Sequence, residues 1–268
     1  MKKCIVVSGP TRFAALAFKD DFTASIRKVA QLGYDAVELA IRDPRAINVE
    51  DIENLLASLN LPVAAIGTGQ AYGDEGLSFT DPEERVRQRA IQRVKDHIAL
   101  AARWQTQVII GLIRGKVTAG TPRELAQSWL VAALQECCAL AEQQGVNLVL
   151  EPINRYETDL INTIAEAIEL IRLVGSDNLK ILADTFHMNI EEPSIVESIK
   201  TAGPYLTHFH IADSNRWAPG YGHLDFPSII STLKEINYQG AVSAEILPKP
   251  DPETCAGATI NYLVRLGL

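Results

Sequence analysis

Four short apolar runs in the second half of the chain each end in a residue that can bind a metal ion. The four end residues are three carboxylates and one imidazole, namely Glu151, Asp184, His210 and Glu245. Each run is typical of a buried strand in a parallel sheet, and the segments between the runs are long enough to hold a crossover helix. Because the carboxyl ends of neighbouring parallel strands meet at one edge of a sheet, we expect the four side chains to lie close together.

This set of ligands indicates which chemistry to expect. Carboxylate oxygens with one imidazole suit a divalent ion such as Mn²⁺, Mg²⁺ or Co²⁺, whereas structural zinc sites contain more sulfur and nitrogen ligands. A hydroxy-ketone can chelate such an ion through its carbonyl and hydroxyl oxygens, and the ion then acidifies the neighbouring C–H and stabilises an enediolate. Glu151 and Glu245 follow strands that are separated by two others. They can therefore face a substrate from opposite sides, one removing a proton and the other returning one.

The elements that must position these residues alternate regularly along the chain. The expected strands are Cys4–Ser8, Ala36–Ala40, Leu61–Ile66, Gln107–Leu112, Asn147–Glu151, Lys180–Asp184, Leu206–His210 and Ala241–Glu245. A helical pattern follows each strand, and no linker or low-complexity segment divides the chain. The length of 268 residues is close to that of one (β/α)₈ barrel, roughly 250 residues. We therefore expect residues 1–268 to form a single TIM-barrel domain of the α/β class, with a doubly wound open sheet as the alternative.

Three local patterns predict how individual elements begin. Asp81-Pro82-Glu83-Glu84 is typical of a helix start, with Asp81 as N-cap and proline in the first helical position. Thr121-Pro122-Arg123-Glu124 fits a capping box. The segment Gly67–Gly73 contains three glycines without the spacing of a nucleotide-binding fingerprint, so we expect a loop in which glycine serves the backbone.

Composition and charge exclude several classes of function. Hydrophobic residues make up 47% and charged residues 22% of the chain, which provides for a large core and argues against disorder. A net charge of −8 without a basic cluster argues against nucleic-acid binding. No apolar run reaches the length of a membrane span and no signal-peptide pattern is present, so we expect a cytoplasmic protein. The four cysteines form neither a CxxC motif nor a disulfide framework.

Individual residues of the predicted site also have simpler interpretations. A single acid at the end of a strand is usually an N-cap, and for Asp184 alone capping is the first expectation. His208 and His210 alternate in one strand, so we expect only one of them to face the barrel interior and the other to pack under a helix. His97 is expected to be buried and neutral. The metal site is therefore inferred from the coincidence of four ligands at four successive strand ends.

Longer motifs around these residues resemble a known family. Asp184–Glu192, Thr201–Pro204, Glu151–Glu157 and His208–His210 with Ser214–Arg216 resemble the ketose 3-epimerases, the D-tagatose and D-psicose 3-epimerase group of the xylose-isomerase-like TIM barrels. The resemblance covers nearly the whole chain and is most specific between Glu151 and Glu245. In the first half, Ala17–Lys19, Ile66–Tyr72 and Ile109–Gly115 resemble the 5-keto-L-gluconate epimerases of inositol catabolism.

The resemblance implies a cofactor and roles for particular residues. It implies that one divalent metal ion, usually Mn²⁺, is bound by Glu151, Asp184, His210 and Glu245, and that the two glutamates also form the acid–base pair. It further implies that His187 and Arg216 hold substrate oxygens near the reacting carbon, with Glu157 as a supporting contact. Members of the group act on small sugars and are commonly homodimers or homotetramers.

Two arginines bear on the choice of substrate. Arg114 follows the strand Gln107–Leu112 and Arg42 follows Ala36–Ala40, so both can face the mouth of a barrel at the end remote from the metal. An arginine there would pair bidentately with a carboxylate, which free ketohexoses lack. The simpler interpretation is a surface salt bridge, for example between Arg42 and Asp43. The sequence thus predicts an epimerase of a keto-hexonate such as 5-keto-L-gluconate or D-tagaturonate.

Other functions stay open at this point. The first alternative is a 3-epimerase of free ketoses such as D-tagatose, D-psicose, D-fructose or L-ribulose. An aldose–ketose isomerase would use the same enediolate and differ in the carbon that receives the proton. An endonuclease of this barrel superfamily would need a histidine-rich zinc site and a basic face, which five histidines and an acidic balance disfavour. A sugar-binding barrel without activity is disfavoured by the presence of both Glu151 and Glu245.

Overall fold

Eight parallel strands close into a barrel in this computed structural model, which describes all residues from 1 to 268. Each strand pairs with the next one in the chain, and the last pairs with the first. The strands are β1 (Lys2–Ser8), β2 (Ala36–Ala40), β3 (Val63–Gly67), β4 (Val108–Ile110), β5 (Leu148–Leu150), β6 (Leu179–Asp184), β7 (Leu206–Ile211) and β8 (Ala241–Ala244). The predicted TIM barrel is confirmed, and the open doubly wound sheet is excluded by the pairing of β1 with β8.

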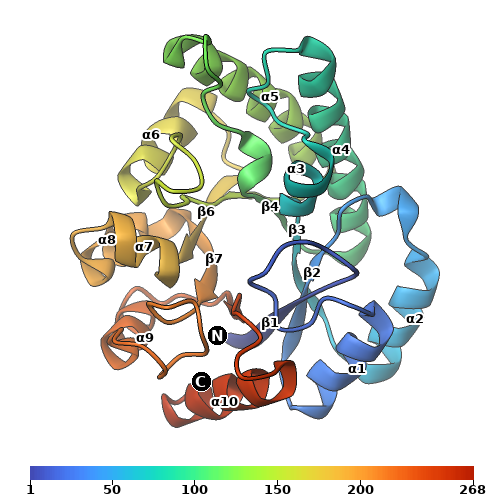
Figure 1. Cartoon of the computed structure of the whole chain (residues 1–268), viewed down its shortest axis with the longest axis vertical. Helices are drawn as coiled ribbons and strands as arrows, with labels where there is room; N and C mark the ends of the chain where they lie inside the picture. Colours follow the sequence, from blue (N-terminus) through green and yellow to red (C-terminus); the bar gives the residue numbers. More distant parts are fainter.

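The helices surround the barrel as an outer ring (Figure 1). They are α1 (Phe22–Gln31), α2 (Val49–Leu59), α4 (Glu84–Trp104), α5 (Arg123–Gln144), α6 (Ile164–Val174), α8 (Ile195–Ala202), α9 (Phe226–Glu235) and α10 (Pro252–Arg265). Two additional short helices, α3 (Gly69–Glu75) and α7 (Thr185–Glu191), follow β3 and β6 directly. They lie at the carboxyl ends of the strands, where the functional residues of a TIM barrel gather. No helix combines the length and the apolar character needed to cross a membrane.

Burial on both faces explains why the strands are almost continuously apolar. A cluster of 67 buried residues joins the strands to the surrounding helices and forms the main core. Inside the barrel, a small separate cluster brings together Ala65, Ile109, Val149 and Leu182 from four neighbouring strands. The small side chains of Cys4, Ala36 and Ala241, from β1, β2 and β8, form another small cluster. The barrel interior is thus packed, with room for larger polar groups beside the small side chains.

Several local predictions were wrong in detail. The expected loop Gly67–Gly73 is helical from Gly69, because Gln70 and Ala71 are buried against the barrel and the helix ends at Gly76 in a left-handed conformation. Helix α4 begins at Glu84, and the Asp81 carboxylate accepts a hydrogen bond from the amide of Glu83 at 2.8 Å, before the helix.

The predicted capping box at Thr121 is likewise absent. Helix α5 begins at Arg123, its N-cap position is occupied by Pro122, and no side chain caps it. The proline therefore lies one residue before the helix rather than at its first position. A true capping box occurs at α6, where the Thr163 hydroxyl and the Glu166 carboxylate each accept a hydrogen bond from the other's backbone amide.

Candidate active site

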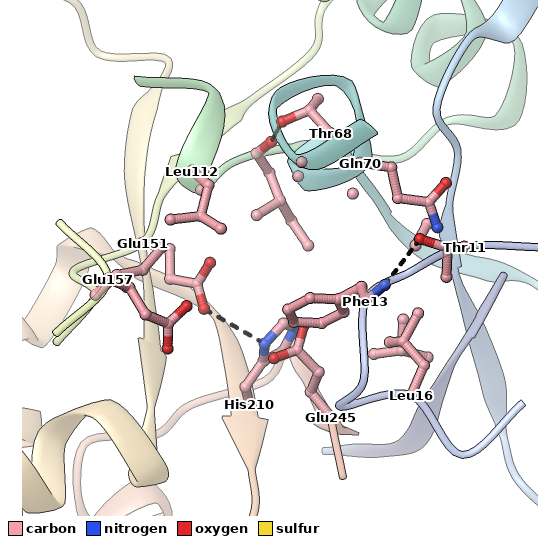
Figure 2. A pocket seen from close by; sticks show the side chains of 18 of the residues that line it. Thr11, Phe13, Leu16, Thr68, Gln70, Leu112, Glu151, Glu157, His210 and Glu245 are labelled. Atoms are coloured by element: carbon pink, nitrogen blue, oxygen red, sulfur yellow. Dashed lines mark hydrogen bonds and ion pairs between the residues drawn. The ribbon is translucent and has the colours of Figure 1, made fainter. Parts of the chain in front are cut away.

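The carboxyl ends of β5 to β8 bring the four predicted metal ligands together. Glu151 and Glu245 directly follow β5 and β8, Asp184 is the last residue of β6, and His210 lies near the end of β7. One oxygen or nitrogen atom from each of the four side chains lies within 4.8 Å of the others. Figure 2 shows Glu151, His210 and Glu245 converging on the floor of a cavity. As expected, the carboxyl ends of these strands lie side by side, because β5 pairs with β6, β6 with β7 and β7 with β8.

Two polar atoms at this point are buried and have no hydrogen-bond partner. They are Nδ1 of His210 and Oδ2 of Asp184, which lie 3.7 Å apart, and the same Nδ1 is 3.7 Å from Oε1 of Glu151. Buried polar atoms rarely lack a partner, so this arrangement calls for one. Three carboxylates and an imidazole suit a hard or borderline divalent cation. The residues present therefore fit a divalent metal ion.

Asp184 serves a second purpose with its other oxygen. Its Oδ1 accepts a hydrogen bond of 2.7 Å from the backbone amide of Phe186 and so caps the amino end of α7. The simpler interpretation of this residue, as an N-cap, is therefore correct. Gly111 contributes by lacking a side chain, because a Cβ atom at this position would lie 2.8 Å from Oε2 of Glu151.

The electrostatic environment divides the carboxylates into two groups. Burial, reinforced by the neighbouring acids, raises the pKa of Glu151 to about 8, and burial also raises the pKa of Glu245. For Asp184 burial acts in the same direction, but His187, His210 and Arg216 outweigh it and lower the pKa. Near neutral pH the metal-free site therefore favours a proton on Glu151, which a bound cation would displace.

The imidazole of His187 lies beside Glu151 and is neutral. It is almost fully buried, and burial is the main reason that its pKa falls to about 4. Its Nδ1 accepts a hydrogen bond of 2.7 Å from the side-chain amide of Asn154, so its Nε2 carries the hydrogen. This Nε2 is 3.8 Å from Oε1 of Glu151. An N–H donor thus points into the site, and Asn154, to which the sequence analysis gave no role, fixes its orientation.

Arg216 also lines the cavity, where it contacts two acids. Its Nη2 donates a hydrogen bond of 2.6 Å to Oε2 of Glu245, and its Nη1 is 3.4 Å from Oε1 of Glu157. The guanidinium carbon is 4.8 Å from the ring centre of Phe186 and 5.3 Å from that of Phe13. These contacts hold the arginine and the Glu245 carboxylate in one orientation.

A cavity of about 240 Å³ opens above these residues and is lined in part by the first half of the chain. Thr11, Phe13 and Leu16 from the segment between β1 and α1 form one wall, and Phe13 projects toward the centre (Figure 2). The Thr11 hydroxyl accepts a hydrogen bond of 3.2 Å from the Phe13 amide. Of the residues predicted from sequence, those that line the cavity are Glu151, Glu157, His187, His210, Arg216 and Glu245. Nothing in the sequence around Thr11–Leu16 identifies this wall.

Neither Arg114 nor Arg42 lies at the cavity, which corrects the prediction that they clamp a substrate carboxylate. Arg114 is fully buried and donates hydrogen bonds to the backbone carbonyls of Leu160, Ile161, Gly111 and Glu151 at 2.5 to 3.2 Å. It braces the chain behind Glu151 and has no free face for a ligand. The side chain of Arg42 is half exposed and lies 3.6 Å from Oε1 of Glu75, so the simpler interpretation, a surface ion pair, describes it.

His208 also departs from the prediction. Residues two apart in a strand point to the same side, so His208 and His210 both face the barrel interior, where both contact Glu38. The expectation that only one of them faces inward was therefore wrong. His97 is buried with both ring nitrogens hydrogen-bonded to backbone carbonyls, and burial lowers its pKa, in line with the expectation.

Comparison with known proteins places this chain in a family. Residues 26–266 match the model of the xylose isomerase-like TIM barrel family. The chain is 33% identical to a D-psicose 3-epimerase of Agrobacterium fabrum over 91% of this chain and 84% of that protein. It is 32% identical to an L-ribulose 3-epimerase of a Methylomonas species, over 86% of this chain and 82% of that protein.

A solved structure gives the same result at the level of the fold. The crystal structure of a Methylomonas D-allulose 3-epimerase in complex with D-allulose superposes with a TM-score of 0.82 and 28% identity, covering 99% of this chain and 98% of that one. The chain therefore belongs to the xylose isomerase-like TIM barrel family and is a sugar epimerase, an enzyme of the isomerase class.

Proposed function

We propose that this protein inverts the carbinol carbon next to the ketone of a ketose, through an enediolate of the sugar. The observation that carries this proposal is the convergence of Glu151, Asp184, His210 and Glu245, with ligand atoms within 4.8 Å of one another at the floor of the cavity. Two of these residues are glutamates from strand ends on different sides of the group, as a reaction that removes and returns a proton on opposite faces requires.

The four residues would hold one divalent cation, with Mn²⁺ as the proposed ion and Mg²⁺ or Co²⁺ as alternatives. The buried and unpaired Nδ1 of His210 and Oδ2 of Asp184 support this assignment. When bound, the ion supplies Lewis-acid polarisation of the ketone, which acidifies the C–H beside it.

The two glutamates are proposed to exchange the proton. One carboxylate takes the proton from the carbinol carbon, and the other, in its acid form, delivers a proton to the opposite face of the same carbon. A carboxyl group with a raised pKa can hold and release a proton near neutral pH, which agrees with the direction found for both Glu151 and Glu245. Arg216 keeps the Glu245 carboxylate in place through their bond of 2.6 Å.

His187 is proposed to donate its Nε2 hydrogen to a substrate oxygen that gains negative charge in the enediolate. Its neutral state and the bond between Asn154 and Nδ1 support this role, because they leave Nε2 as the donor. Glu157 would act indirectly, by holding residues that face the substrate. Its Oε1 accepts a hydrogen bond of 2.9 Å from Asn154 and contacts Arg216.

A free ketose is one candidate substrate. The two relatives named above are a D-psicose and an L-ribulose 3-epimerase, and neither Arg42 nor Arg114 lines the cavity as a carboxylate clamp would. The wall formed by Phe13 and Leu16 presents apolar surface to the carbons of a sugar.

A keto-hexonate is a second candidate, and one observation favours it. Arg12 lines the cavity beside Phe13 and makes no ion pair or side-chain hydrogen bond within the protein. The other cation in the wall, Arg216, is already held by Glu157 and Glu245. Arg12 could thus bind the carboxylate of 5-keto-L-gluconate or D-tagaturonate, a contact worth about 1.5–3 kcal/mol for a charged hydrogen bond.

Proton exchange followed by NMR in D₂O, with Mn²⁺ added, tests the proposed reaction. D-Fructose, D-tagatose, D-psicose, D-tagaturonate and 5-keto-L-gluconate would be offered separately. Epimerisation is expected to place deuterium on the inverted carbon. Deuterium on the former carbonyl carbon, with an aldose as product, would instead identify an aldose–ketose isomerase and would overturn the proposal.

The variant Arg12→Ala decides between the two substrate classes. If keto-hexonates are the substrates, the variant is expected to raise their KM by roughly 10- to 100-fold and to leave neutral ketoses unaffected. Arg42→Ala is the matched control, because it removes an arginine outside the cavity. Equal effects of Arg12→Ala on charged and neutral sugars would exclude a carboxylate contact.

A further inference from the structure

A line of buried polar side chains runs down the barrel interior below the proposed metal site. From the site downward it contains His210 and Glu38, then His208, and at its lower end Gln107. Glu38 lies on β2, the two histidines on β7, and Gln107 directly before β4. Glu38 and both histidines are at most 2% exposed. Polar groups this deep in a barrel must be paired with one another, and none below His210 has a part in the proposed chemistry.

Glu38 is at the centre of this line and contacts both imidazoles. Its Oε2 is 2.7 Å from Nε2 of His208 and 3.0 Å from Nε2 of His210, and its Oε1 is 3.1 Å from the same atom of His210. No lysine or arginine pairs with it. Both of its oxygens lie almost equally close to the one Nε2 of His210, as two acceptors that share one N–H, so Glu38 is a carboxylate that accepts from both rings.

Gln107 determines which nitrogen of His208 carries its hydrogen. The Gln107 Oε1 accepts a hydrogen bond of 3.1 Å from the Thr207 hydroxyl, which orients the amide. Its Nε2 then faces two backbone carbonyls, at 3.4 Å each, and Nδ1 of His208 at 3.2 Å. Because this Nδ1 accepts, the hydrogen of a neutral His208 is on Nε2, where it is donated to Glu38.

The same logic fixes the ring of His210. Glu38 accepts only, so Nε2 of His210 must carry a hydrogen and donate it. The atom left to bind a cation is Nδ1, which is the atom that faces Glu151 and Asp184 at 3.7 Å and has no partner. The contact with Glu38 thus sets both the orientation of the ring and the nitrogen that it presents.

We infer that Glu38, held by His208 and Gln107, is a positioning residue that prepares His210 to bind the metal ion through Nδ1. The inference rests on the metal site of the proposed function and adds residues that do not touch the ion. A carboxylate that accepts from the remote nitrogen of a metal-binding imidazole fixes its tautomer and makes it a stronger ligand. Loss of such a contact typically weakens metal affinity by about 10- to 100-fold.

The variant Glu38→Gln tests this role at constant size. The amide has one accepting atom for two N–H donors, and its NH₂ group would face a ring nitrogen that already carries a hydrogen. His210 is then free to place its hydrogen on Nδ1, where it blocks the cation. Titration of the metal-free protein with Mn²⁺ alone, read from the electron paramagnetic resonance signal of free Mn²⁺, is expected to show Kd raised by about 10- to 100-fold.

Glu53→Gln is the matched control. Glu53 is an ion-paired glutamate on α2, where it contacts Arg103 and Trp104 in the helix layer outside the barrel. This variant is expected to bind Mn²⁺ as the unaltered protein does. If Glu38→Gln also binds Mn²⁺ with a Kd within twofold of the unaltered protein, the inference is overturned. If the unaltered protein does not bind Mn²⁺ at all, the metal site of the proposed function fails instead.

A double-mutant cycle with His210→Asn tests whether Glu38 acts through His210. The effect of Glu38→Gln on the Kd of Mn²⁺ is expected to disappear when His210 is already replaced, because no imidazole remains to be oriented. Additive effects would contradict the inference. Should Glu38→Gln fail to fold, Glu38→Asp serves in its place, because it keeps the charge but is too short to bridge both rings. Unchanged affinity of Glu38→Asp would also count against the inference.

Discussion

The side chain of Asp184 divides two tasks between its two oxygens. Oδ1 caps helix α7 through the Phe186 amide, and Oδ2 faces His210 without a hydrogen-bond partner. A sequence pattern can propose capping or metal binding for this residue, but it cannot show that one oxygen caps the helix while the other stays unpaired. The cap also helps to position His187, because His187 lies on α7 and this helix begins directly after Asp184.

The two glutamates give the most direct prediction at the residue scale. Glu151→Gln and Glu245→Gln keep an oxygen that can contact a cation but cannot take up or deliver a proton. Each is expected to lower kcat by about 10²- to 10⁴-fold, the range of general acid–base catalysis. Steady-state rates with added Mn²⁺, together with deuterium exchange, would measure this. A variant that retains more than a tenth of the rate would remove that glutamate from the proposed acid–base pair.

The position of residues at the ends of predicted strands was enough to predict the centre of the candidate site, but not the side chains around it. The positions of Glu151, Asp184, His210 and Glu245 depend on backbone pairing, which the alternation of elements foretells. The direction of a long side chain depends instead on packing from distant segments. Arg114 follows a strand as a ligand-binding arginine would, yet it turns inward to carbonyls contributed by Leu160 and Ile161.

The helix starts mark a similar limit at the scale of the element. The strands were predicted within about two residues of their observed ends, because each is an apolar run bounded by polar residues. Proline at a helix start was misplaced in both α4 and α5, where Pro82 and Pro122 precede the first helical turn. Proline is compatible with the extended backbone just before a helix as well as with its first turn, so the residue type alone does not decide.

The segment η2 (Leu112–Arg114) and the turn at Leu160–Ile161 depend on Arg114, which leads to a prediction about stability. Arg114→Met would leave four buried backbone carbonyls without this donor, at a cost of about 1–3 kcal/mol for each group that stays unpaired. The free energy of unfolding, measured in urea, is therefore expected to fall by several kcal/mol. Arg42→Ala, which removes a half-exposed ion pair, is expected to cost about 1 kcal/mol or less.

This comparison also separates the two roles considered for Arg114. If Arg114 bound a substrate carboxylate, the Arg114→Met variant would lose activity on keto-acids and keep its stability. If Arg114 instead supports the backbone behind Glu151, the variant loses stability, and any loss of activity does not depend on the charge of the substrate. A stable Arg114→Met variant with a selective loss on keto-acids would therefore contradict the position found here.

At the scale of the whole molecule, the barrel concentrates negative charge along its axis. Four carboxylates lie within or beside the site, of which Glu38, Glu151 and Asp184 are buried and Glu245 is partly buried. They are opposed by Arg216 and by the histidines of β7. Without a cation, bound protons reduce this negative charge, in agreement with the raised pKa values of Glu151 and His210. We therefore expect folding, proton binding and metal binding to be coupled in this protein.

The coupling predicts how the stability of the metal-free protein depends on pH. The pKa of Glu151, about 8 in the folded protein, is raised above the ordinary value of 4.5, and that of His210 is raised above 6.5. Both groups then hold protons in the folded state that the unfolded chain releases. Between pH 6.5 and 8 stability is expected to fall as pH rises, with a slope of up to about 1.4 kcal/mol per pH unit for each group. Below pH 6.5, His187 and His97 act in the opposite direction, because burial lowers their pKa values.

Mn²⁺ is expected to replace these protons and so to reverse the trend. Because the ion competes with fewer protons as pH rises, its affinity and the increase in Tm at a fixed concentration are expected to be larger at pH 8 than at pH 6.5. Thermal unfolding at both pH values, with Mn²⁺ and with chelator, would measure this. In Glu151→Gln one of the two titrating groups is absent, so the slope of the metal-free protein is expected to be shallower. Equal stabilisation by Mn²⁺ at both pH values would show that no proton is displaced, and would argue against cation binding at Glu151 and His210.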